Sequence, residues 1–107
     1  MDLYYGLVKV DHFKRGADAY FLTHYHGDHM VGLRKRWGGK PIHCTATTAA
    51  LLKVGKLVAE TSLAPLAMDE TVSVRLSDRS VRVTPLEANH CPGACMFLFE
   101  EDRKSVV

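Results

Sequence analysis

The chain has 107 residues, enough for one folded domain and too few for two. Its 24% charged residues, eight Gly and four Pro are near the average for globular proteins, which excludes a disordered or collagen-like chain. The formal net charge of +2 is too small to indicate a nucleic-acid binder by itself. The sequence shows no basic leader and no apolar run of about 18 residues, so it predicts neither a secretory signal nor a membrane helix.

The three cysteines, Cys44, Cys91 and Cys95, are odd in number and form no Cys-x-x-Cys pair. This pattern argues against a disulfide framework and against a Cys-rich zinc finger. It predicts reduced thiols in a protein of the cytosol or the nucleus.

The first half of the chain alternates between strand and helix patterns. Residues 3–10 and 19–23 are apolar and β-prone, and the turn chemistry of residues 14–18 separates them. Residues 28–37 carry apolar side chains at helical spacing, with Asp28 able to cap the start and two glycines after the end, so a short helix is predicted there.

Residues 41–44 then predict a further strand, and Thr45 opens a second helix that runs to about Val54. Gly55 and Pro65 bound a connection that is expected to be irregular.

The second half predicts strands. Residues 72–76 and 81–84 alternate apolar and polar side chains around a turn, which is typical of a hairpin with one buried face. Residues 94–99 are almost wholly apolar and predict a strand that is buried on both faces. After a polar turn at 101–104, residues 105–107 resemble the start of another strand. The expected fold class is therefore α/β or α+β layers.

The segment His24-Tyr25-His26-Gly27-Asp28-His29 places four potential metal ligands within six residues. A chain of this composition would contain the pattern by chance roughly once in a thousand cases. Residues two apart on an extended chain point the same way, so His24 and His26 face one side and the following turn brings Asp28 and His29 beside them. Three imidazoles with a carboxylate suit zinc or another borderline divalent ion. A lone histidine at a strand end is usually a surface residue, but four grouped ligands reverse that expectation.

Two further residues could join this site. His90 lies in a polar loop between two apolar strands and is the natural further imidazole, although it could also be a solvent-exposed loop residue. Asp11 follows a strand and could orient a ligand imidazole through its second ring nitrogen, the alternative being a role in a turn or cap.

Three segments resemble the first three motifs of the metallo-β-lactamase superfamily. They are Val10–Phe13, Phe21–Leu33, and residues 88–94 with the apolar stretch 96–100 that follows them. The loop Asn89-His90-Cys91-Pro92-Gly93 with its Met-Phe-Leu-Phe tail is similar to the DNA cross-link repair nucleases of the β-CASP branch, the group that includes Artemis and Apollo. The resemblance covers nearly the whole chain.

This resemblance implies a set of ligands. His24, His26 and His90 would bind a first metal ion, Asp28 and His29 a second, and Asp11 would support them. One or two Zn²⁺ ions are implied, with Asp28 as the catalytic residue that orients a water or holds the second ion. The implied activity is metal-dependent hydrolysis of DNA phosphodiester bonds, of the 5′ exonuclease kind, in cross-link repair in the nucleus.

The resemblance also implies a domain boundary. Residues 1–107 would form the N-terminal half of a metallo-β-lactamase αββα sandwich, a partial domain that stops before the fourth motif and the β-CASP segment. The fourth motif, an Asp near the end of the next strand, would come just beyond Val107.

Other interpretations remain open. The chain could belong to an RNA-processing nuclease or a small-ester hydrolase, because fold and metal motif do not fix the substrate. It could also be a truncated fragment that binds metal or a partner without catalysis. The basic run Arg34-Lys35-Arg36 with Lys40 could contact DNA phosphates, although such a run is more often a solvated face.

The remaining histidines and cysteines have weaker claims to the site. His12 and His43 are expected to be structural. Cys91 could be a ligand, although a buried thiol or one beside the ligands is favoured.

Overall fold

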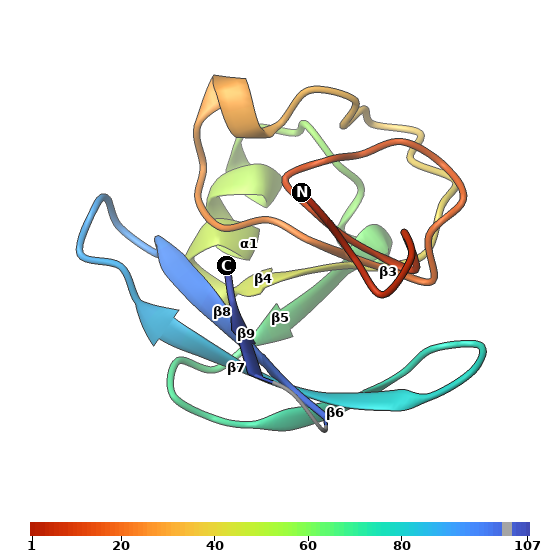
Figure 1. Cartoon of the computed structure of the whole chain (residues 1–107). Helices are drawn as coiled ribbons and strands as arrows, with labels where there is room; N and C mark the ends of the chain where they lie inside the picture. Colours follow the sequence, from red (N-terminus) through yellow and green to blue (C-terminus); the bar gives the residue numbers. More distant parts are fainter. Residues whose placement is uncertain (102–103) are drawn as a thin grey trace.

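A computed structural model describes residues 1–101 and 104–107. Two β-sheets pack face to face, and helix α1 (Ala46–Val54) lies against the outer face of one of them (Figure 1). Two short 3-10 turns, η1 (Gly27–His29) and η2 (Glu60–Ser62), lie in the connections. The predicted fold class, α/β layers as in the N-terminal part of an αββα sandwich, is confirmed.

The first sheet is mixed, and its strands follow one another in chain order. Its strands are β1 (Asp2–Leu3), β2 (Val8–Val10), β3 (Ala19–Phe21), β4 (Ile42–Thr45) and β5 (Leu63–Leu66). Strand β1 pairs antiparallel with β2, and β2 to β5 are parallel neighbours. Parallel pairing brings the carboxyl ends of β2, β3 and β4 to the same edge of this sheet.

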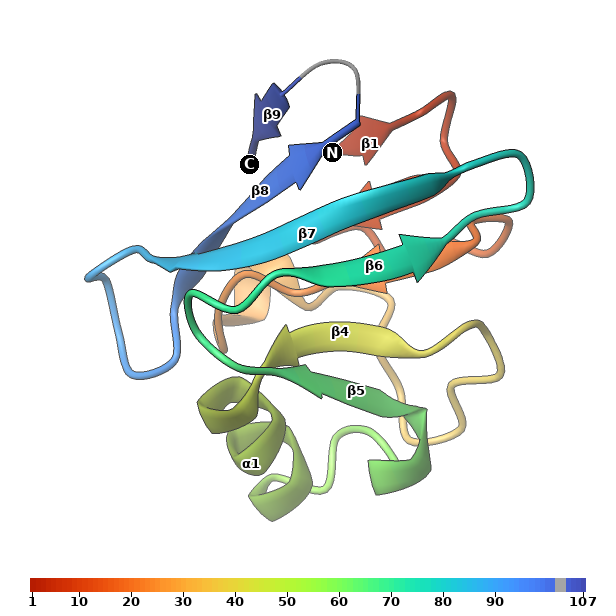
Figure 2. The same cartoon turned by 90° about the horizontal axis from the view of Figure 1, so that it is seen from below.

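The second sheet is an antiparallel meander. Its strands are β6 (Val72–Arg75), β7 (Ser80–Glu87), β8 (Cys95–Glu100) and β9 (Lys104–Val106), in that order. Figure 2 shows them side by side across the face of the molecule. The predicted hairpin and the predicted strand near the end of the chain are confirmed, and residues 102–103 of the predicted polar turn lie outside the described residues.

Apolar side chains from both sheets form the core between them. Phe21 of β3 packs edge-on against Phe97 and Phe99 of β8, with ring centroids 5.1 Å apart in each pair. All three rings are fully buried, so this contact removes a large apolar area from water. Side chains alternate between the two faces of a strand, so Phe97 and Phe99 project from the same face of β8 and both reach Phe21.

A second core lies between the mixed sheet and α1. Leu52 of the helix packs with Leu22 and Ile42, which project from the other face of the sheet. As predicted, Thr45 begins the helix: its side chain accepts a hydrogen bond from the Thr48 backbone N–H. No helix within the described residues has the length and apolar character needed to cross a membrane.

The predicted helix over 28–37 is wrong. Only η1 forms, and residues 30–41 follow as turns and loop. Gly32 gives the physical reason, because its φ of +98° is a left-handed conformation that an α-helix cannot contain. A Cβ at this position would lie 2.6 Å from the Phe13 carbonyl oxygen, so the chain is drawn against the loop that follows β2.

Three strand boundaries also differ from the prediction. Residues 3–10 divide into β1 and β2, because Tyr4, Tyr5 and Gly6 adopt positive φ values and form a turn. The irregular connection that was expected up to Pro65 contains strand β5, which lies at the sheet edge, where a residue without an N–H is tolerated. Strand β8 is buried on one face only, and Met96 on its other face is exposed.

His43 of β4 faces the core between the sheets. Its ring stacks on Phe21 with centroids 4.8 Å apart, and its Nδ1 is buried without a hydrogen-bond partner among the residues the structure describes. Burial lowers the pKa of His43 below its ordinary value, since a charged imidazole would lose its hydration there.

We expect this buried imidazole to make the fold acid-sensitive. The folded chain holds His43 neutral, whereas the unfolded chain protonates it near pH 6.5, so stability falls as the pH drops below that value. His43→Leu should make the free energy of unfolding depend less steeply on pH. Urea unfolding of both proteins between pH 5 and pH 8, with chelator present, measures it, and identical slopes would show that His43 does not contribute.

Candidate metal centre

Histidines gather where the carboxyl ends of the parallel strands meet. Asp11 follows β2, and Thr23 and His24 follow β3, after which the chain turns through η1. The second sheet reaches the same edge, because the Cys95 N–H at the start of β8 donates to the Thr23 carbonyl at 2.9 Å. Carboxyl ends of parallel strands are a usual location for binding sites in α/β folds.

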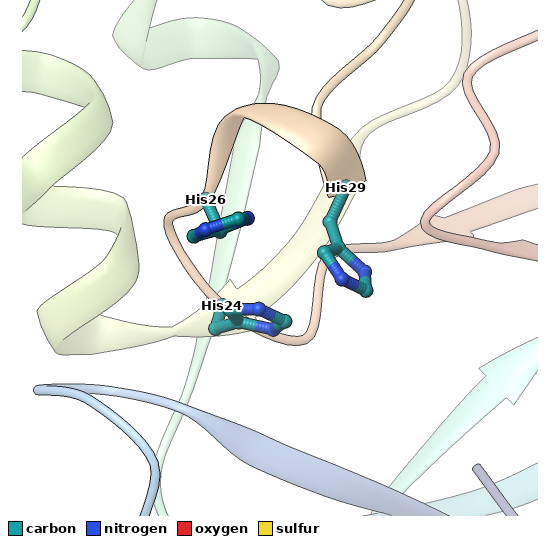
Figure 3. A group of neighbouring side chains, drawn as sticks. All are labelled: His24, His26 and His29. Carbon is teal, nitrogen blue, oxygen red and sulfur yellow. The ribbon is translucent and has the colours of Figure 1, made fainter.

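Three imidazoles converge at this edge. The rings of His24, His26 and His29 face a common space beneath η1 (Figure 3). One nitrogen from each of the three lies within 4.8 Å of the others. His26 is exposed and the other two are half-buried, so the cluster is open to solvent on one side.

Hydrogen bonds determine which nitrogen is the donor in two of the three rings. The Thr23 hydroxyl donates its only proton to Asp11 Oδ2 at 2.6 Å, so it must accept from His24 Nδ1–H at 2.8 Å. Asp11 Oδ2, a carboxylate oxygen, likewise accepts from His29 Nδ1–H at 2.9 Å. In the neutral form of each of these rings the proton is therefore on Nδ1 and Nε2 is free, which is the tautomer that binds a metal ion.

The electrostatics favour the neutral form of His24. Burial, with a further contribution from His29, lowers the pKa of His24. Because a metal ion binds only the neutral ring, this shift keeps His24 available as a ligand. Two of the thiols behave differently, since burial raises the pKa of Cys44 and of Cys95 to about 12 and leaves them unreactive.

His90 lies beside the cluster on the loop between β7 and β8. Its ring meets that of His24 edge-on, with centroids 4.9 Å apart. The loop is held against the start of α1, where the Thr45 hydroxyl donates to the Gly93 carbonyl at 2.7 Å and the Thr48 hydroxyl donates to it at 3.2 Å. The helix start thereby fixes the segment that carries His90.

The grouping differs from the one that the resemblance implied. The structure groups the ligand nitrogens of His24, His26 and His29, whereas the resemblance placed His90 with the first two and His29 with Asp28. The side chain of Asp28 is 89% exposed, and its Oδ2 lies 3.9 Å from His26 Nδ1. Cys91, on the loop with His90, is half-buried and does not join the three-imidazole group.

The residues present fit a divalent metal ion. Three imidazoles, with a fourth ring adjacent, form a donor set typical of zinc, and a carboxylate behind them is its usual support. Tetrahedral nitrogen ligands of zinc lie about 3.4 Å apart, as follows from the metal–nitrogen distance. The ligand nitrogens, which lie within 4.8 Å of one another, would need to approach by up to about 1.4 Å, within reach of side-chain rotations.

Sequence reasoning missed the residues that hold the ligands in place. Thr23 was not identified as the link between Asp11 and His24, although it immediately precedes the histidine cluster. Thr45 was identified as a helix cap. Its hydroxyl also donates to the carbonyl of Gly93, which lies 48 residues further along the chain, and no local pattern indicates such a contact.

We expect His26→Ala to lose metal. The substitution removes one of three converging donors, so zinc bound per chain after dialysis should fall well below the parent value, and the stabilisation by zinc should fall with it. Elemental analysis and thermal unfolding with and without zinc measure both effects. The control is His12→Ala, because His12 lies outside the cluster. Equal zinc content in parent and His26→Ala would contradict this assignment.

We expect Gly93→Ala to displace the His90 loop. Gly93 has φ +83°, and a Cβ there would lie 2.8 to 2.9 Å from atoms of Thr47 and Thr48. The fold should lose about 1–3 kcal/mol of stability through backbone strain alone. Gly27→Ala is the matched control, because its Cβ would meet nothing within 4 Å. Denaturant unfolding of the metal-free proteins measures the difference, and equal stabilities would disprove the docking role.

Comparison with known proteins shows similar sequences. The family model described as a beta-lactamase superfamily domain matches residues 8–107. The DNA cross-link repair protein SNM1 of Arabidopsis thaliana is 44% identical over 85 residues, which are 79% of this chain and 17% of that protein. The 5′ exonuclease Apollo of Gallus gallus is 44% identical over 85 residues, 79% of this chain and 18% of that protein.

A third relative has a similar identity to this chain. The human DNA cross-link repair 1A protein is 43% identical over 95 residues, which cover 89% of this chain and 8% of that protein. The chain thus spans less than a fifth of the length of each of these relatives. The family match covers nearly all of the chain, including every residue of the histidine cluster, and the chain belongs to the beta-lactamase superfamily.

Proposed function

We propose that the protein carrying this sequence is a metal-dependent DNA nuclease that hydrolyses phosphodiester bonds during cross-link repair. The observation that carries the proposal is the convergence of three imidazoles, two of them held through Nδ1 so that Nε2 is left for a metal ion, at an open edge of the fold. The names of the similar proteins, DNA cross-link repair protein and 5′ exonuclease, supply the substrate and the 5′ polarity. A nuclear location follows from this role as part of the proposal.

The imidazoles of His24, His26 and His29, with His90 beside them, would hold one or two Zn²⁺ ions. Such an ion lowers the pKa of water toward neutrality and offsets the negative charge that develops on a phosphoryl group. The chain's own contribution is positional: Asp11 and Thr23 fix the ring orientations before the substrate arrives.

Asp28 is proposed to act directly on the reacting groups. Its carboxylate is exposed at the mouth of the cluster, so it can accept a proton from a water molecule or join a second ion. Two of the three imidazoles, His24 and His29, are half-buried, whereas the Asp28 carboxylate is exposed and can face the substrate. This placement suits a group that orients the attacking water.

We expect Asp28→Ala to reduce DNA cleavage by a factor on the order of 10² or more while the fold is retained. The assay uses the full-length protein and 5′-phosphorylated single-stranded DNA, with zinc and with chelator. Asp78→Ala is the control, because Asp78 is an exposed carboxylate in the β6–β7 turn. Full activity of Asp28→Ala would remove Asp28 from the mechanism.

Other outcomes of this assay would favour the alternatives. The 107 residues alone should be a poor nuclease even where they bind metal, because by resemblance a further carboxylate ligand comes from the fourth motif. Chelator-sensitive cleavage by these residues would contradict that expectation. If the full-length protein cleaves neither DNA nor RNA but hydrolyses a small ester, the nuclease proposal is wrong.

A further inference from the structure

A basic cavity lies beside the metal centre. Its volume is about 440 Å³, and it is formed between the loop after β2 and the loop after η1. Lys14 and Arg15 line it from the first loop, and Arg34 and Arg36 line it from the second. No Asp or Glu is among its lining residues. A cavity with cations on two walls and no carboxylate favours an anionic ligand.

These cations have no ion-pair partner in the described part of the chain. No ion pair among residues 1–101 and 104–107 involves Lys14, Arg15, Arg34 or Arg36. Arg15 donates to the Gly38 carbonyl at 3.5 Å, which positions the guanidinium without cancelling its charge. Their mutual repulsion would be relieved by a bound polyanion.

The backbone gives the cavity its shape. Gly32 packs against the Phe13 carbonyl and brings the two loops together. A residue with a Cβ at this position would push the two loops apart. Arg34 and Arg36 both line the cavity, whereas Lys35 between them does not. Alternate residues of a non-helical segment thus face the same space.

The basic region continues beyond this cavity. A second cavity of about 340 Å³ shares Arg15 and Gly38 with the first and adds Lys40. Together the two cavities, which we call the basic groove, present five cations: Lys14, Arg15, Arg34, Arg36 and Lys40. This is far more local positive charge than the net +2 of the chain suggests.

The basic groove begins next to the metal centre. His12, on its lining, directly follows Asp11, and Val31, also on its lining, is two residues after His29. Two residues of extended chain span at most about 7 Å. An anionic polymer with a phosphate at the imidazoles would therefore place neighbouring phosphates at the groove.

We propose that the basic groove binds the backbone phosphates of the nucleic-acid strand that is cleaved at the metal centre. This inference rests on the proposed function, because it assigns the path of the same substrate. Contact is through phosphates and not through bases: Trp37 is only 9% exposed, its ring packs against Phe13 and Tyr20, and its Nε1–H donates to the Lys40 carbonyl. Binding should therefore be independent of sequence and strongly dependent on salt.

The test measures the salt dependence of single-stranded DNA binding by fluorescence anisotropy. The full-length protein, Arg34→Ala/Arg36→Ala and Arg75→Ala/Arg82→Ala are compared with chelator present, so that no cleavage occurs. The control pair removes the same charge from exposed positions on β6 and β7. Loss of two phosphate contacts should reduce the slope of log K against log salt by about 1.4 in the groove variant only. A strand with uncharged methylphosphonate linkages should bind all three proteins equally weakly.

Each outcome is decisive for one of the two proposals. Equal slopes in all three proteins, or equal losses in both variants, would overturn the groove assignment. Chelator-sensitive DNA cleavage by the parent together with equal slopes would overturn the groove alone. Groove-dependent binding by a protein that cleaves no nucleic acid with zinc present would instead overturn the proposed function and leave the groove as a phosphate-binding site.

Discussion

One carboxylate holds the candidate metal centre together. Asp11 accepts hydrogen bonds from the Thr23 backbone N–H at 2.8 Å, the Thr23 hydroxyl at 2.6 Å and His29 Nδ1 at 2.9 Å. It thereby joins the end of β2 to the end of β3 and to the turn beyond it. Since the Thr23 hydroxyl also accepts from His24, the same carboxylate fixes the protonated nitrogen of two rings. Asp11 itself has φ +53°, a conformation that Asp tolerates better than most residues.

The rest of the site depends on the parallel pairing of β2, β3 and β4. If these strands were antiparallel, Asp11, Thr23 and Thr45 would not come to one edge. With them parallel, β2 supplies the carboxylate, β3 supplies the imidazoles, and β4 leads to the Thr45 hydroxyl that holds the His90 loop through Gly93. Two layers of the fold are thereby joined at the site.

Sequence reasoning could predict residues whose role is local. The cluster from His24 to His29, Asp11 at a strand end and Thr45 at a helix start all follow from short-range patterns. Contacts over long separations could not be predicted in this way, and they explain the errors: Gly32 is held left-handed against Phe13, so the expected helix is lost. The one-sided burial of β8 likewise depends on which layer covers it, which residues 94–99 do not indicate.

The position of Gly32 also determines how the basic groove is built. In a helix, residues two apart point to different faces, so Arg34 and Arg36 could not line one cavity. The loop that replaces the helix directs both into the same space and leaves Lys35 outside it. The same loop starts at η1, whose last residue is His29, and is held by Gly32 against the segment that starts at Asp11. The cations of the basic groove and the candidate metal ligands are thus held near one another by the close approach at Gly32 and by the His29–Asp11 hydrogen bond, and a side chain at Gly32 would disturb both groups.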